Sequence, residues 1–186
     1  LFGWIAAHEA DLYAGLSAAE VGLLYSPANR DLVDQVSGEP YNVENSRHFA
    51  AYRAAACELH RAHIPFDIVL DTDVHQFDRF HVLIAPALEL MSDTTALALC
   101  SFSGALITIG ATGGYNEWLT PRIVPALAGR AQVRLKRAGA TLAQAADTGL
   151  LRTSAPATLQ LGLHTTPGGY RMVIVNTARH PTKACT

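Results

Sequence analysis

Apolar residues in this chain occur in two patterns, short continuous runs and longer stretches that repeat every three or four positions. Continuous runs are typical of strands covered on both faces of a sheet, and the three-to-four repeat is typical of amphipathic helices. The runs predict strands at 21–25, 66–70, 82–85 and 105–109. The repeats predict helices over 2–16, from the N-cap Ser46 to just before Pro65, and from the N-cap Ser92 to about Phe102.

The stretch between Ala28 and Asn45 is polar and contains Gly38 and Pro40. Residues of this kind interrupt regular structure, so we expect a long loop with at most one turn of helix. Loops of that length inside a compact domain are often functional.

Strands and helices alternate in this order up to Ile109, which implies parallel strands joined by right-handed crossovers. The predicted fold class is therefore α/β, a flavodoxin-like three-layer sandwich with a mostly parallel sheet. Beyond Pro125, runs at 133–137, 158–164 and 170–175 suggest further strands, and the turn 165–169 between the last two predicts a hairpin. We expect an α/β domain over 1–152 and the start of a small β domain or C-terminal hairpin over 153–186.

Composition narrows the function classes. Apolar residues make up 49% of the chain and charged residues 16%, which is typical of a folded domain. The net charge of -2 provides no broad positive field, which argues against a nucleic-acid partner. No apolar run reaches the roughly 18 residues that a bilayer requires, which argues against a membrane partner.

Three cysteines are present, far apart and without a C-x-x-C pair, so a reduced, cytoplasmic location is the simpler expectation. Cys57 and Cys100 fall inside predicted helices, and we expect both to lie in or near the core. The chain begins at Leu1 rather than at methionine, which is compatible with a piece of a longer protein.

Candidate chemistry collects where the predicted strands end, because ligands of open α/β sheets bind beyond the carboxyl ends of the strands. The residues expected at this edge are Ser26, Asn29, Asp71, Asp73, Ala87, Glu89, Tyr115, Glu117 and the glycine turn 110–114. We single out Asp71, Asp73, Thr112, Gly113, Gly114 and Tyr115 as candidate ligand-binding residues. The competing interpretation is that Asp, Ser, Asn and Gly stand at strand ends for backbone reasons alone.

Asp71, Asp73 and His75 could form a metal site or an acid/base group, since carboxylates and imidazole suit both roles. The same residues would serve equally well as a solvated loop, and we assign no metal to them. His60 and His63 share a side of the predicted helix without an H-E-x-x-H pattern, which favours ordinary surface or boundary histidines.

Three segments together carry a family resemblance: Val21-Gly-Leu-Leu-Tyr-Ser-Pro, Phe80-His-Val-Leu-Ile-Ala-Pro-Ala-Leu followed by Ser92-Asp, and Gly104-Ala-Leu-Ile-Thr-Ile-Gly entering a glycine turn. Over about residues 1–130 the chain resembles the class I glutamine amidotransferase-like domain of glycoside hydrolases, notably the trimerisation domain of family 42 β-galactosidases. In the amidotransferases a nucleophilic cysteine occupies a G-x-C-x-G elbow.

The matching stretch here is Gly110-Ala111-Thr112-Gly113-Gly114, with Thr112 in place of the cysteine and no His-x-Glu pair after it. A threonine hydroxyl is a poor nucleophile without a base. The resemblance thus implies a domain with no catalytic residue and no cofactor. We also expect Thr112 to lie at the carboxyl edge of the sheet with a strained backbone.

In the β-galactosidases that this chain resembles, the domain follows a TIM barrel, precedes a small β domain and contacts neighbouring subunits. The resemblance therefore implies a non-catalytic accessory or oligomerisation domain of a carbohydrate-active enzyme. Its expected partners are another copy of the chain or a catalytic domain, and a carbohydrate ligand is compatible with that role.

Two alternatives remain open. One is an independent hydrolase or amidase that uses Asp71, His75 or Thr112 together with the glycine amides. The other is a module that binds a sugar or an anion on the turn from Gly110 to Tyr115.

Overall fold

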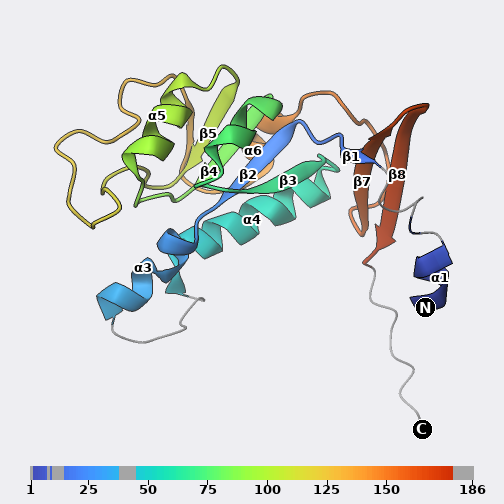
Figure 1. The fold of residues 1–186 in the computed structure, drawn as a ribbon, viewed down its shortest axis with the longest axis horizontal. Helices are drawn as coiled ribbons and strands as arrows, with labels where there is room; N and C mark the ends of the chain where they lie inside the picture. The colour runs from blue at the N-terminus through green and yellow to red at the C-terminus, as the bar shows by residue number, and fades with distance from the viewer. Residues whose placement is uncertain (1, 8, 10–14, 38–44, 178–186) are drawn as a thin grey trace, which may run out of the picture.

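A five-stranded parallel sheet forms the centre of the fold in the computed structural model, which describes residues 2–7, 9, 15–37 and 45–177 (Figure 1). The strands lie in the order β3-β2-β4-β5-β6, and every neighbouring pair is parallel. This is the flavodoxin-like order, in which the first strand of the sheet lies inside the second. The predicted α/β fold class is confirmed. The strands are β2 (Val21–Tyr25), β3 (Phe66–Leu70), β4 (Val82–Pro86), β5 (Ala105–Ile109) and β6 (Val133–Leu135).

Helices cover both faces of this sheet and make the three layers. On one face, Leu59 of α4 and Leu142 of α6 pack with β-strand side chains such as Ile84. On the other face, Leu99 of α5 and Phe77 pack against the opposite side of the same strands. The helical segments are α1 (Phe2–Ala7), α3 (Pro27–Ser37), α4 (Arg47–Arg61), the 3-10 helix η2 (Val74–Arg79), α5 (Asp93–Ser101) and α6 (Ala140–Ala146).

Two predicted helix starts are confirmed by their caps. The Ser46 hydroxyl accepts a hydrogen bond from the Phe49 N–H at 3.2 Å, and the Ser92 hydroxyl accepts one from the Thr95 N–H at 3.1 Å. Each cap satisfies a donor that the first helical turn leaves without a partner. Both helices begin at the carboxyl edge of the sheet, α4 near the end of β2 and α5 after the end of β4.

Helix α3 corrects the expectation of a loop after Ala28. It begins at Pro27 and runs for 11 residues. Proline is favoured at the first helical position because its missing N–H has no partner there, and the Ser26 carbonyl accepts the first helical bond from Arg30 at 3.0 Å. Residues 38–44 of the same predicted loop lie outside the described residues.

The predicted helix over 2–16 is wrong at its C-terminal end, because Leu16 and Ser17 form the short strand β1. The competing interaction is tertiary: β1 pairs antiparallel with β7, with Leu16 opposite Thr165. Residues 10–14 of that prediction lie outside the described residues. Helix α6 has no counterpart among the predicted elements.

The cysteine prediction is also wrong, since Cys57 and Cys100 are both exposed. Helix geometry explains this outcome. Ala55 and Leu59 of α4 and Ala96 and Leu99 of α5 are buried in the core. Cys57 lies between the two buried positions of α4, and Cys100 follows Leu99 on α5, so each cysteine is on a solvent-facing side of its helix.

A small antiparallel sheet accompanies the α/β unit and contains the predicted hairpin, β7 (Leu159–Thr166) and β8 (Gly169–Asn176). Its third strand is β1 (Leu16–Ser17), which comes from before the parallel sheet in sequence. Figure 1 shows this sheet at the end of the molecule away from α3 and α5. Within the described part of the chain, no helix is both long and apolar enough to cross a membrane.

Candidate functional site

A cavity of about 460 Å³ opens beyond the carboxyl ends of β2 and β4. The chain crosses from β2 to β3 on one side and from β3 to β4 on the other, so this is the switch point at which doubly wound sheets bind ligands. The volume lies within the usual range for small-molecule sites. The lining residues are Asn29, Leu32, Asn45, Ser46, Arg47, His48, Ala87, Glu89, Tyr115 and Leu119.

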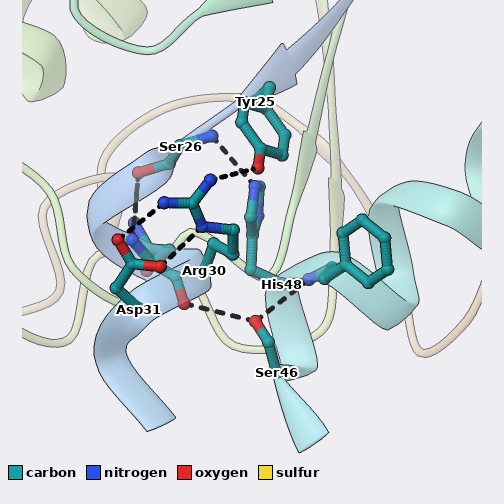
Figure 2. Close-up of polar contacts among 8 residues, drawn as sticks. Tyr25, Ser26, Arg30, Asp31, Ser46 and His48 are labelled. Atoms are coloured by element: carbon teal, nitrogen blue, oxygen red, sulfur yellow. Dashed lines mark hydrogen bonds and ion pairs between the residues drawn. The ribbon is translucent and has the colours of Figure 1, made fainter. Parts of the chain in front are cut away.

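His48 forms the buried floor of this cavity, in the first turn of α4. Its Nε2 accepts a hydrogen bond from the Ser26 N–H at 2.9 Å (Figure 2). Nδ1 therefore carries the proton and donates to the Pro86 carbonyl at 2.6 Å. The ring packs beside Tyr25 and Tyr52, with ring centroids 5.5 and 6.2 Å away. Burial lowers the pKa of His48, because water is excluded from the imidazolium form.

The two bonds of His48 join the ends of β2 and β4 to α4. With both ring nitrogens engaged, the imidazole holds no free lone pair with which to take a proton from a substrate. His48 is therefore a cross-link of the switch point, in the neutral form.

Asn29 of α3 makes the second cross-link of this edge. Its amide nitrogen donates to the Leu90 carbonyl at 2.6 Å and to the Ser26 hydroxyl at 2.9 Å, and its oxygen accepts from the Leu90 N–H at 2.8 Å. The side chain is buried and satisfied on both ends. Asn29 thereby fixes the segment after β4 to the start of α3.

Arg30 and Asp31 lie on the outer side of the same network. Arg30 pairs with Asp31 at 2.5 Å and also donates to the Tyr25 hydroxyl at 3.2 Å. Figure 2 shows this pair beside the His48 ring, between α3 and the end of β2. The ion pair positions Tyr25 against the histidine.

Asp71 and Asp73 follow β3, and the structure separates their environments. Asp71 is buried, and burial raises its pKa, although the Ser26 hydroxyl donates to its carboxylate and partly offsets this effect. Asp73 is only half-buried and accepts a long bond from the Gln76 amide at 3.4 Å. Neither residue lines the cavity, so of this pair only Asp71 is connected to the site, through Ser26.

Tyr115 and the pair Arg47–Glu89 form the walls of the cavity. Arg47 contacts Glu89 at 3.1 Å, and both residues line the cavity. The Tyr115 N–H donates to the Glu89 carbonyl at 3.0 Å, and the Tyr115 carbonyl accepts from the Met91 N–H at 3.1 Å. The turn after β5 is thus hydrogen-bonded to the segment after β4, and this places the predicted residue Tyr115 at the site.

The glycine turn after β5 differs from the prediction for Thr112. Thr112 lies close to the strand end and is half-buried, but its φ is not in the left-handed region. The expectation of a strained Thr112 backbone is wrong, because Gly110 (φ 75°) and Gly113 (φ 68°) adopt the left-handed conformations of this turn. A strained non-glycine residue does occur at this edge, at Ala87 (φ 44°), which follows β4.

Gly113 and Gly114 have unlike surroundings. The Gly113 N–H donates to the Leu88 carbonyl at 2.7 Å, and a Cβ at this position would lie 2.9 Å from the Cβ of Ala126. At Gly114 a Cβ would meet nothing within 4 Å. Gly113 is therefore required by close packing, whereas the position of Gly114 tolerates a side chain.

The structure does not bring the residues of the hydrolase alternative together. Asp71 follows β3 and Thr112 follows β5, with β2 and β4 between them, so their backbones are separated by about 14 Å from strand spacing alone. His75 lies exposed on η2. In the described ranges of the chain, no group of three or more His, Cys, Asp or Glu side chains is placed to hold a metal ion.

Arg47 and His48 were not among the residues expected at this edge. A usable signal existed, because Ser46 was a predicted N-cap and crossover helices begin at the carboxyl edge of a parallel sheet. The first turn of α4 therefore had to lie there. The exact partners of His48 depend on loop conformations that no residue pattern specifies.

The known proteins that resemble this chain are found among solved structures. No protein-family model matches the chain, and no curated protein matches it. A β-galactosidase from the psychrophilic Marinomonas ef1 matches 93% of this chain over 25% of its own length, with 16% identity and a TM-score of 0.53. The apo exo-carrageenase GH42 from Bacteroides ovatus matches 84% of this chain over 22% of its own, with 10% identity and a TM-score of 0.56.

A β-galactosidase from Bacillus circulans sp. alkalophilus matches 63% of this chain over 18% of its own length, with 20% identity and a TM-score of 0.52. The chain shares its fold with part of these glycoside hydrolases. It spans between 18% and 25% of the length of the three proteins.

Proposed function

We propose that this chain is a non-catalytic accessory domain of a β-galactosidase-like glycoside hydrolase, and that it contacts a catalytic domain or a second copy of the chain. The observation that carries the proposal is the use of the polar side chains at the switch point. The hydrogen bonds of these side chains connect β2, β4, α3 and α4 to one another, and they are made by His48, Asn29 and Ser26. A catalytic pair would need a base with a free lone pair beside a nucleophile.

The contact surface in this proposal is the loop 116–124, which we call the apolar loop. Trp118 is 80% exposed, and Ile123 and Val124 are also exposed. Several large apolar side chains exposed within one short loop favour an interaction surface, because large apolar groups on a surface often mark sites of protein–protein contact.

The backbone of the apolar loop is fixed although its apolar side chains are exposed. The Asn116 side chain accepts from the N–H groups of Trp118 and Thr120 at 3.0 and 2.9 Å. Arg122 donates to the Met91 carbonyl at 2.9 Å and pairs with Asp93 at 2.6 Å. A preorganised apolar surface loses little conformational entropy on docking, which favours a stable contact.

Photo-cross-linking in the protein, purified with the flanking sequence that its gene encodes, tests the contact. With Trp118→p-benzoylphenylalanine, we expect capture of either the catalytic domain of the same chain or a second subunit, identified by mass spectrometry. Ile68, 62% exposed on the edge strand β3, provides the control position for the same substitution. Capture at position 118 that does not exceed capture at position 68 would contradict the proposed contact.

Assembly gives a second measurement. If the contact joins two copies, the double variant Trp118→Ser/Ile123→Ser should lower the mass measured by light scattering, while Ile68→Thr should leave it unchanged. The non-catalytic part is tested by assaying the 186-residue chain against ester, amide and glycoside reporters, with Thr112→Ala and His75→Ala as controls. Turnover that either substitution abolishes would overturn it.

A further inference from the structure

A second depression, of about 360 Å³, adjoins the switch-point cavity along the carboxyl ends of β4, β5 and β6. The two share Arg47, Ala87 and Glu89 in their linings, so they meet at the Arg47–Glu89 pair. We call the two together the edge groove.

Positive charge is concentrated in the second depression. Lys136 and Arg137, which follow β6, line it together with Arg47, and Glu89 supplies the one carboxylate in its lining. Arg47 is paired with Glu89, but in the described part of the chain neither Lys136 nor Arg137 has a side-chain hydrogen bond or ion pair. The whole chain carries a net charge of -2, so this local excess of cations is not a consequence of composition.

The remaining lining leaves room beside these cations. Ala50, Ala51 and Ala54 of α4 form one wall, and Gly110 stands at the end of β5. Small side chains do not extend into the depression, so a bound group could reach the guanidinium and ammonium groups directly. The lining of the adjoining cavity includes the apolar Leu119 and the ring of Tyr115 as well as polar groups such as Asn45.

We propose that the edge groove binds a saccharide that carries an anionic substituent. The sugar ring occupies the 460 Å³ cavity, with an apolar face against Tyr115 and Leu119 and hydroxyls toward Asn45 and Glu89. The sulfate, phosphate or carboxylate group lies over Arg47, Lys136 and Arg137. Guanidinium and ammonium groups bind such anions through charge-assisted hydrogen bonds. The saccharide class rests on the proposed function, whereas the anionic class rests on the charges of the groove.

Calorimetric titration of the purified protein tests this proposal. The probes are galactose, galactose 6-sulfate, galactose 6-phosphate, galacturonate and inorganic sulfate. We expect at least one of the three anionic sugars to bind about tenfold or more tightly than galactose and inorganic sulfate, because each charge-assisted bond is worth that much. Added salt should weaken this binding, since the cations are exposed.

Matched variants locate the site. The double variant Lys136→Gln/Arg137→Gln should weaken anionic-sugar binding by about tenfold or more. Arg134→Gln removes one charge from β6 at an exposed position that lines neither depression, and it should leave the affinity unchanged. Glu89→Gln should strengthen binding, because it removes the one carboxylate that repels the anion and frees Arg47.

Each outcome decides a part of the proposal. Absence of binding by all three anionic sugars would overturn it, as would equal losses in the Arg134 and Lys136/Arg137 variants. Galactose binding as tightly as the anionic sugars would overturn the anionic class, and inorganic sulfate binding as tightly would overturn the saccharide class. The cross-linking at position 118 does not depend on these titrations, so failure here leaves the proposed contact separately testable.

Discussion

Replacement of His48 by alanine should destabilise the fold by about 3–4 kcal/mol. The substitution leaves the Ser26 N–H and the Pro86 carbonyl, which bond to His48 at 2.9 and 2.6 Å, without a hydrogen-bond partner. Each unsatisfied buried group costs about 1–3 kcal/mol. It also removes a ring packed beside Tyr25 and Tyr52, for which buried large-to-small changes cost about 2–5 kcal/mol. These contributions sum to about 4–11 kcal/mol, which is an upper bound because water from the adjoining cavity can reach the two groups left without a partner; we therefore expect about 3–4 kcal/mol, slightly below the lower end of the sum.

Urea unfolding followed by far-UV circular dichroism measures this change as a shift in the midpoint at constant slope. His75→Ala is the matched control, since His75 is exposed on η2, and it should change the free energy of unfolding by less than about 0.5 kcal/mol. A loss below about 1 kcal/mol for His48→Ala would refute the argument that this side chain joins the strand ends.

The pH dependence of stability provides an independent test of the same residue. Because burial lowers the pKa of His48 in the folded protein, the unfolded chain binds the proton first as the pH falls below its ordinary value of about 6.5. Stability should therefore be full above that pH and fall below it, by at most about 1.4 kcal/mol per pH unit for this group. His60, whose pKa burial also lowers, contributes in the same direction. His48→Ala should reduce the slope but not abolish it, and an unchanged slope would contradict the buried neutral form.

Three further predictions concern the candidate residues. Asp71→Asn should raise the free energy of unfolding at pH 7, because burial raises the pKa of Asp71 and penalises its ionised form; the gain should vanish below about pH 4, where the carboxyl is protonated in both states. Gly113→Ala should cost about 2–4 kcal/mol from its left-handed φ and its 2.9 Å approach to Ala126, whereas Gly114→Ala should be neutral, and equal thermal shifts for the two would contradict this account. Thr112→Cys should create no glutaminase activity, as measured by ammonia release from glutamine, because the turn supplies no histidine base; measurable release would show that the site can be reactivated.

The parallel sheet was predictable mainly because its three central strands, β2, β4 and β5, are buried on both faces. Side chains such as Leu23, Ile84 and Ile107 are fully buried, so selection for apolar residues extends along the whole strand and produces the continuous runs. The helix caps Ser46 and Ser92 were predictable for a local reason, since each serine bonds to an amide three residues ahead.

Elements that depend on distant partners were not predictable from local patterns. Leu16 reads as the end of an amphipathic helix, yet its backbone pairs with β7. Helix α6 is only 7 residues long, and its buried positions Leu142 and Ala146 are too few to establish a repeat. Short elements of this kind take their stability from tertiary packing rather than from intrinsic propensity.

The position of the candidate site was predictable, but the hydrogen-bond partners of its residues were not. Strand ends identified the edge that holds Asn29, Glu89 and Tyr115. They did not reveal that His48 would use both nitrogens within the fold, or that the strained residues of the site would be Ala87 and Leu119 rather than Thr112. Those outcomes depend on how the loops after β4 and β5 bond to each other across the edge.

The pairing of β1 with β7 has a consequence for the order of folding. The Thr165 hydroxyl donates to the Leu16 carbonyl across a sequence separation of 149 residues, and the whole parallel sheet lies between the two partners in the chain. Contacts of such separation form late, because the intervening chain must first become compact. During synthesis the backbone of Leu16 and Ser17 therefore stays without its β7 partner until residue 165 has emerged from the ribosome. A chain arrested before that point would lack β7 and leave the backbone of β1 without its partner, so pairing of β1 distinguishes a finished copy from an incomplete one.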